Sequence, residues 1–188
     1  MWACMTVLFF GVRRAGEIVP SPEQINMGFL VPMVKDLHFI HHPIPAAVLR
    51  LNKTKTTVHG INVIMGCTGH AVCPLCAVVT LLVKRGISDT THVNQPLFMM
   101  QSGIPMDKNT FTARMRSLIQ NLGLDPRGFT PHSFRSGGAT QLALNGVNEQ
   151  IIQKAGMWSS MCYRRYIRES IHTLASYTKL FIPNNHSS

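Results

Sequence analysis

The chain has 188 residues, of which 45% are apolar, and it carries 18 Lys and Arg against 8 Asp and Glu, for a formal net charge of +10. This length suits one domain that buries its apolar surface without disulfides, and the five unevenly spaced cysteines argue against a secreted disulfide framework and indicate a reducing compartment. The positive charge favours a polyanionic partner, above all nucleic acid. No low-complexity tail carries this charge, so we expect the basic face to belong to the fold.

The amino-terminal segment is predicted to be a buried helix over residues 2–17, apolar almost all round until Arg13 and Arg14. It lacks a basic leader and is too short to span a bilayer, so no signal peptide is predicted. An apolar helix at the first residue indicates that the chain begins inside a fold, as a piece of a larger protein would. Three prolines then interrupt the regular pattern: Pro20, Pro22 and Pro32.

The next segments predict a small antiparallel sheet and a second apolar helix. Residues 47–53 and 60–66 alternate apolar and polar side chains around Thr54-Lys55-Thr56-Thr57, which predicts a β-hairpin with a lysine near its turn. Residues 74–85 are predicted to form a helix, because Lys84-Arg85-Gly86 is typical of a helix carboxy terminus.

The second half of the chain is predicted to be helical throughout. Apolar residues recur at helical spacing over 109–122, and Gly123 supplies a stop. Thr130-Pro131 is typical of an N-cap followed by a first helical residue, so a helix is expected to begin there and to end near Asn145-Gly146. Shorter helices are predicted after it, at 149–155, 161–168 and 171–181, before a polar tail at 183–188.

His132 and Arg135 are spaced so that both side chains can reach one phosphate, because they lie one helical turn apart. The free N–H groups and the dipole at the start of their helix also favour a bound anion. Gly137-Gly138 in the same helix costs about 1 kcal/mol per glycine relative to alanine, which indicates close approach of another backbone or of DNA. For an isolated His-x-x-Arg, two solvated surface residues are the commoner alternative.

Five separated elements keep the order found in one family of DNA enzymes. They are Arg-x-x-Glu near the start, a hairpin lysine, His-x-x-Arg, a Trp after a glycine, and a tyrosine. In this sequence they correspond to Arg14, Lys55, His132 with Arg135, Trp158 and Tyr166. Three positions have a neighbour of the same type: Arg13 is the alternative to Arg14, Lys53 lies beside Lys55, and Tyr163 is the rival of Tyr166 one turn earlier. The pattern resembles the catalytic domain of the tyrosine recombinases, the phage integrase family.

The resemblance implies a role for each basic residue. Arg14 and Arg135 would clamp the scissile phosphate through bidentate guanidinium contacts, with Glu17 orienting Arg14. Lys55 would donate a proton to the departing 5′ oxygen, and His132 would act as acid or base on the attacking tyrosine.

The resemblance also implies the nucleophile. Tyr166 would attack phosphorus and form a 3′-phosphotyrosine, which requires no metal or nucleotide cofactor. Trp158 occupies a position where many members carry histidine, and its indole N–H can donate a hydrogen bond to a phosphate oxygen. The step from Trp158 to Tyr166 is about one residue shorter than in many members. For both Tyr163 and Tyr166, ordinary helix packing is the alternative interpretation.

The implied fold is α+β, mainly α, with a small antiparallel β-sheet: one tyrosine recombinase catalytic domain over residues 1–182 and a polar tail over 183–188. The resemblance covers the catalytic domain alone, so we expect these residues to lack the amino-terminal DNA-clamp domain of such enzymes. Details such as Arg-Ala-Gly-Glu and His-Ser-Phe-Arg resemble the eukaryotic DIRS and crypton transposon enzymes, which places the protein in the nucleus by analogy. Helix 171–181 would dock on a neighbouring protomer, as in a tetramer on double-stranded DNA, or pack in cis.

The implied function is DNA strand cleavage and rejoining in site-specific recombination or integration. Two alternatives stay open: a domesticated, transposon-derived DNA-binding module without catalytic activity, and a type IB topoisomerase. A zinc site is weighed separately, because Cys67, His70, Cys73 and Cys76 follow one another at intervals of three. Zinc sites usually have two ligand pairs separated by a longer loop, and Cys73-Pro74-Leu75-Cys76 is equally typical of a buried helix start. No metal is therefore assigned from the sequence.

Overall fold

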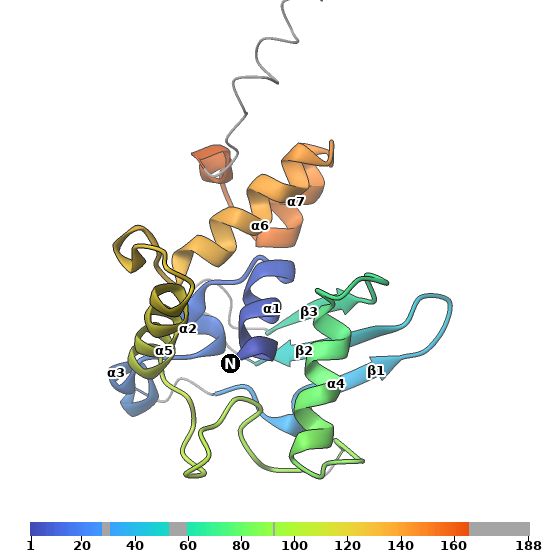
Figure 1. The fold of residues 1–188 in the computed structure, drawn as a ribbon. Coiled ribbons are helices and arrows are strands. Elements are labelled where there is room, and N and C mark those ends of the chain that lie inside the picture. The colour runs from blue at the N-terminus through green and yellow to red at the C-terminus, as the bar shows by residue number, and fades with distance from the viewer. Residues whose placement is uncertain (28–30, 53–59, 92, 166–188) are drawn as a thin grey trace, which may run out of the picture. The chain divides into compact units, whose positions relative to one another are not determined.

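The computed structural model describes residues 1–27, 31–52, 60–91 and 93–165. The chain divides into two units, Met1–Gly138 and Ala139–Ser188, which we treat separately. The first unit carries most of the helices and a three-stranded sheet (Figure 1). Among the described residues, no helix combines the length and hydropathy needed to cross a membrane.

The amino-terminal segment forms two helices rather than the single one predicted over 2–17. Helix α1 runs over Trp2–Phe10 and α2 over Ala15–Ile18. The prediction was wrong because Val12 adopts a left-handed conformation, with φ of 50°, which ends one helix and redirects the chain before the next begins. Cys4, Val7 and Leu8 of α1 have no exposed surface, so the predicted burial is confirmed.

The proline-rich segment after α2 is more regular than predicted. Helix α3 runs over Pro22–Asn26, with Pro22 at its first position. Ser21 caps it, because its hydroxyl accepts a hydrogen bond from the Gln24 backbone N–H at 3.3 Å, and the Gln24 side chain accepts one from the Ser21 N–H in return. A short 3₁₀ helix, η1, follows at Val34–Asp36.

The sheet has three antiparallel strands in the order β1-β2-β3. Their bounds are Leu37–Ile40, Ala46–Leu51 and Ile61–Gly66. The predicted hairpin is confirmed as β2 and β3, which pair from Ala46 with Gly66 to Leu51 with Ile61; its predicted turn, with Lys53 and Lys55, lies outside the described residues. Strand β1 was not predicted, and it pairs with β2 on the side opposite β3.

Two predicted helices complete the core of the first unit. Helix α4, over Pro74–Lys84, packs against α1 and against strands β2 and β3 (Figure 1), and helix α5 spans Lys108–Asn121 and buries Phe111 and Met115. Both agree with the sequence pattern. A short 3₁₀ helix, η2, follows at Pro126–Gly128.

Helix α6 runs over His132–Leu144, so its assigned start lies one residue after the predicted Pro131. The entry to α6 is closed by a reciprocal pair, in which the Ser133 backbone N–H donates to the Thr130 carbonyl at 2.8 Å and the Thr130 N–H donates to the Ser133 hydroxyl at 3.0 Å. Gly146, with φ of 74°, follows its carboxy terminus as predicted.

The second unit begins within α6, at Ala139. Helix α7 spans Glu149–Gly156, is capped by the Asn148 side chain, and ends at Met157 in the left-handed conformation. The chain then forms a 3₁₀ helix, η3, over Met161–Arg165, where the sequence predicted a helix over 161–168. The rest of that segment, the predicted helix 171–181 and the tail lie outside the described residues. The described parts are mainly helical with a small antiparallel sheet, so the predicted α+β class is confirmed.

Candidate functional site

The bend between α1 and α2 places two arginines side by side in the chain with different surroundings. The Arg13 side chain is buried, with 3% of the residue exposed, and its Nε donates to the Gly11 carbonyl at 2.6 Å. Burial lowers the pKa of Arg13, which Glu17 counteracts and the neighbouring Arg14 reinforces. Arg13 is therefore a buried cation held by the backbone of the bend itself.

Arg14 points toward solvent and is anchored by Glu17. Its Nη1 lies 3.1 Å from Glu17 Oε1, and its backbone N–H donates to Glu17 Oε2 at 3.2 Å. The Arg14 side chain is 36% exposed, while that of Glu17 is only 5% exposed. One carboxylate thus fixes the backbone and the guanidinium of Arg14 at once, which is the pairing that the Arg-x-x-Glu spacing predicted.

Arg135 reaches the same bend from α6. It is the largest fully buried side chain of the described residues, with 1% exposed, and its Nη1 donates to the Val12 carbonyl at 3.0 Å, across 123 positions of sequence. The left-handed conformation of Val12 belongs to this same peptide segment. Arg135 therefore joins the predicted His-x-x-Arg motif to the predicted Arg-x-x-Glu motif through a backbone carbonyl.

The glycines beside Arg135 explain how α6 comes so close to α1. A Cβ atom on Gly138 would collide with the Phe9 carbonyl oxygen, and one on Gly137 would lie 3.4 Å from the Phe9 ring. The close approach of another backbone, predicted from Gly137-Gly138, is confirmed for Gly138. Since α6 can reach the end of α1 only without a side chain there, Gly138 is part of what positions Arg135.

His132 lies one turn before Arg135 and is exposed. Its pKa is lowered, first by partial desolvation and then by the positive charges of Arg135 and Arg14. The neutral imidazole, which can accept a proton, is therefore favoured near neutral pH. One arginine from each predicted motif thus lowers the pKa of His132, so the two motifs lie close together.

This locality is suited to hold a phosphate. Among the described residues it contains Arg13, Arg14 and Arg135, with three positive charges, and Glu17, with one negative charge. It also lies at the start of α6, a 13-residue helix whose first N–H groups favour anions. We call these four residues with His132 the arginine cluster. Guanidinium groups match the geometry of a phosphate and stabilise charge that grows on its oxygens.

The second unit contains a different polar cluster around Tyr163. Tyr163 is 2% exposed, its hydroxyl donates to Glu149 Oε2 at 2.9 Å, and Arg164 pairs with the same oxygen at 2.8 Å. The pKa of Glu149 is lowered by its bonds from Arg164 and then from Tyr163. We call Glu149, Tyr163 and Arg164 the Glu149 cluster.

Trp158 belongs to the hydrophobic side of the same unit. Only 6% of it is exposed, and its ring packs at 5.9 Å from that of Tyr163. The indole occupies the space that a side chain on Gly156 would need, and the Trp158 carbonyl accepts a hydrogen bond from the Gln153 amide at 3.0 Å. Packing is thus one established role of Trp158.

The structure brings together three of the six predicted catalytic residues, Arg14, His132 and Arg135, in the first unit. Trp158 lies in the second unit, and Lys55 and Tyr166 lie outside the described residues. Sequence reasoning missed the Val12 carbonyl, because a backbone acceptor leaves no signal in residue type. It also missed Glu149 as the partner of Tyr163, although an acidic residue in the first turn of a helix was visible.

Comparison with known proteins gives a consistent picture. The model of the phage integrase family matches residues 44–171, whereas no curated protein matches the chain. Three solved structures are similar to it in fold. One is the XerH site-specific recombinase bound to palindromic difH substrate in a post-cleavage complex, with 16% identity and a TM-score of 0.66, covering 95% of this chain and 44% of that one.

The second similar structure is the XerA recombinase, with 20% identity and a TM-score of 0.63, covering 97% of this chain and 57% of that one. The third is the Tn1549 transposon integrase in complex with circular intermediate DNA, with 18% identity and a TM-score of 0.56, covering 94% of this chain and 56% of that one. The chain spans about half the length of these solved proteins. The fold predicted from the five motifs is confirmed.

Proposed function

Because the chain belongs to the phage integrase family, whose model matches residues 44–171, we propose that it cuts and rejoins DNA strands in site-specific recombination or integration. The proposed partner is double-stranded DNA, in keeping with the net charge of +10. Of the three solved structures described above, the XerH recombinase is bound to its difH substrate and the Tn1549 integrase is in complex with circular intermediate DNA. The whole enzyme would act as an oligomer on DNA.

The hydrogen bond from Arg135 to the Val12 carbonyl carries this proposal. It ties together two motifs that are 123 positions apart and that the family resemblance assigns to one phosphate clamp. Plain surface arginines would not be expected to share one buried bend, since burying a guanidinium is costly unless it is well bonded. The arrangement supports a clamp in which Arg14 and Arg135 hold the two non-bridging oxygens of the scissile phosphate.

In the proposed reaction, the phenolic oxygen of Tyr166 attacks phosphorus. The new bond is a 3′-phosphotyrosine, and the bond to the 5′ oxygen breaks as Lys55 supplies the proton for that leaving group. His132 accepts the proton of the tyrosine, for which its lowered pKa suits it. Ionising a phenol of pKa about 10 costs about 4 kcal/mol at neutral pH, and nearby arginines reduce this cost.

The surroundings of Tyr163 support Tyr166 as the nucleophile. The Tyr163 hydroxyl is engaged with Glu149 at 2.9 Å, and its ring packs against Trp158. Tyr163 would have to break both its hydrogen bond to Glu149 and its ring contact with Trp158 before its hydroxyl could attack DNA. Tyr163 therefore fits a structural role, and we assign the attack to Tyr166.

The proposal is tested with a pool of DNA duplexes that carry randomised sequence next to a nick. Cleavage near the nick releases a short 5′-hydroxyl fragment, so the protein stays covalently attached and is detected as labelled DNA on a denaturing gel. We expect an adduct from the unaltered chain and from Tyr163→Phe, and none from Tyr166→Phe.

Other outcomes would redirect the proposal. If DNA is retained in native gels but no adduct forms, the chain is a DNA-binding module rather than a strand transferase. If Tyr163→Phe abolishes the adduct and Tyr166→Phe does not, the nucleophile is Tyr163. Relaxation of supercoiled DNA by the monomer would instead favour a type IB topoisomerase.

A further inference from the structure

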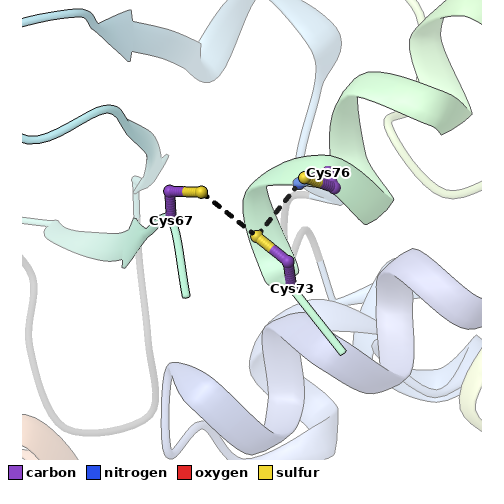
Figure 2. Close-up of side chains that lie close together, drawn as sticks. All are labelled: Cys67, Cys73 and Cys76. Atoms are coloured by element: carbon purple, nitrogen blue, oxygen red, sulfur yellow. Dashed lines mark hydrogen bonds between the residues drawn. The ribbon is translucent and has the colours of Figure 1, made fainter. Parts of the chain in front are cut away.

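Three cysteine thiols converge where the sheet meets α4, in a part of the first unit that the proposed chemistry does not use. Cys67 directly follows β3, Cys73 is the N-cap of α4, and Cys76 lies in its first turn. All three sulfurs lie within 4.8 Å of one another. Figure 2 shows Cys67 and Cys76 flanking Cys73, with the sulfur atoms of Cys67 and Cys73 turned toward each other.

The sulfur spacing is that of ligands around one ion. Cys67 Sγ and Cys73 Sγ are 3.9 Å apart, far more than the 2.05 Å or so of a disulfide bond. Two thiolates on one tetrahedral zinc ion, each about 2.3 Å from the metal, are about 3.8 Å apart. The pair therefore needs almost no movement to receive a zinc ion, whereas bond formation between the sulfurs would require them to approach.

The loop that carries the thiols is held by its own hydrogen bonds. The Cys67 N–H donates to the Pro45 carbonyl at 2.8 Å, the Thr68 hydroxyl donates to the Val72 carbonyl at 3.0 Å, and the Cys76 N–H donates to Cys73 Sγ at 3.5 Å. A loop fixed in this way loses little conformational freedom when it binds an ion. The thiol positions are thus set before any ion arrives.

The three cysteines differ in their exposure to solvent. Cys73 is 1% exposed, while Cys67 and Cys76 are exposed. One ligand is thus anchored in the core and two face solvent, so an ion can enter from outside. His70, which the sequence offered as a fourth ligand, is exposed and is not a member of the group of converging ligand atoms.

We propose that Cys67, Cys73 and Cys76 bind one zinc ion, with a water molecule in the fourth position, and so fasten the end of β3 to the start of α4. Thiolate sulfur selects soft and borderline ions such as Zn²⁺ over Mg²⁺ or Ca²⁺. Binding releases the thiol protons to solvent. This site is separate from the arginine cluster and takes no part in the proposed cleavage.

The test uses the full chain, purified with a non-thiol reductant and stripped with a chelator. Native mass spectrometry should then show one zinc ion per chain after zinc is added, and Co²⁺ should produce a thiolate-to-metal charge-transfer band that zinc abolishes. Zinc should also raise the Tm of the unaltered chain. Because these readouts come from the unaltered protein, they hold even if a variant fails to fold.

Variants define the ligands. Cys67→Ser and Cys73→Ser should each weaken zinc binding more than about 100-fold, beyond the 10–100-fold typical of an outer-shell partner. Cys162→Ser, which removes a thiol of the second unit, and His70→Asn should leave the affinity unchanged, and circular dichroism checks that each variant folds. Absence of zinc and of the cobalt band in the unaltered chain would overturn the proposal, as would a Cys67–Cys73 disulfide in its place or loss of zinc in His70→Asn.

Discussion

The arginine cluster and the Glu149 cluster both contain arginines, but their main hydrogen-bond acceptors differ. In the first, Arg13 and Arg135 are buried and donate to the backbone carbonyls of Gly11 and Val12. In the second, Arg164 pairs with a carboxylate that also accepts from Tyr163. The two clusters thus differ in their acceptors: backbone carbonyls hold the two buried arginines of the first, whereas the carboxylate that holds Arg164 is shared with a buried tyrosine.

The largest expected effect comes from Arg135→Ala. The change removes a clamp group from the proposed site, so we expect covalent adduct formation to fall by about 10²–10³-fold or more, the usual cost of losing one transition-state donor. It also leaves the Val12 carbonyl without its donor, which costs about 1–3 kcal/mol in the free energy of unfolding. Single-turnover adduct assays and urea unfolding measure the two effects.

Arg135→Lys serves as the control for charge in this comparison. Lysine keeps the positive charge but lacks the planar fork of donors, so we expect adduct formation between that of the unaltered chain and that of Arg135→Ala. Full activity with lysine would contradict a bidentate clamp.

The next effect in size concerns the approach of α6 to α1. Gly138→Ala places a methyl group against the Phe9 carbonyl, so the helix must shift and we expect a loss of about 1–3 kcal/mol in unfolding free energy. Adduct formation should fall with it, because Arg135 moves with α6. Gly128→Ala is the matched control, since a Cβ there meets no atom within 4 Å. Equal urea midpoints for the two variants would show that the close approach is unimportant.

The Glu149 cluster should contribute to stability but not to cleavage. Since its partners lower the pKa of Glu149 in the folded protein, the stabilisation is present above the unfolded value, about pH 4.3, and is lost as pH falls through the lower folded value. We expect Glu149→Gln to be less stable than the unaltered chain at neutral pH and the difference to shrink in acid. Urea midpoints measured across pH test this, and a constant difference would speak against it.

The smallest expected effect is on the titration of His132. Its lowered pKa means that its NMR titration midpoint should lie below the ordinary value of about 6.5, and Arg14→Gln should move it upward because one repelling charge is gone. Adduct formation should decline as pH falls through this midpoint, if His132 accepts the tyrosine proton. If the His132 midpoint is the same in Arg14→Gln as in the unaltered chain, His132 does not belong to the arginine cluster.

The parts of the fold that were predictable are those set by local pattern. Helices α4, α5 and α6 and the β2–β3 hairpin follow from periodicity and from their end signals. Strand β1 was missed because Leu-His-Phe-Ile has only four residues, too few to show a clear alternation of apolar and polar side chains. The break at Val12 was missed because a β-branched residue in the left-handed region runs against its own preference.

In the candidate site, too, the features set by local spacing could be predicted and the contacts between distant residues could not. The pairing of Arg14 with Glu17 follows from a spacing of three within one segment, and the shared turn of His132 and Arg135 follows from helix geometry. The hydrogen bond from Arg135 to Val12 could not be predicted, because its acceptor is a backbone atom made available by the fold. Likewise, no local pattern indicates that the Tyr163 hydroxyl is engaged by Glu149.

The hydrogen bond from Arg135 to Val12 also has a consequence for the newly made chain. Arg135 is synthesised 123 residues after Val12, an interval of roughly 6–25 s at typical synthesis rates. A valine in the left-handed conformation costs on the order of 1–3 kcal/mol unless its surroundings hold it. The bend that carries Arg13 and Arg14 therefore gains this support only after Arg135 has been made, and until then the proposed phosphate clamp lacks one of its two arginines.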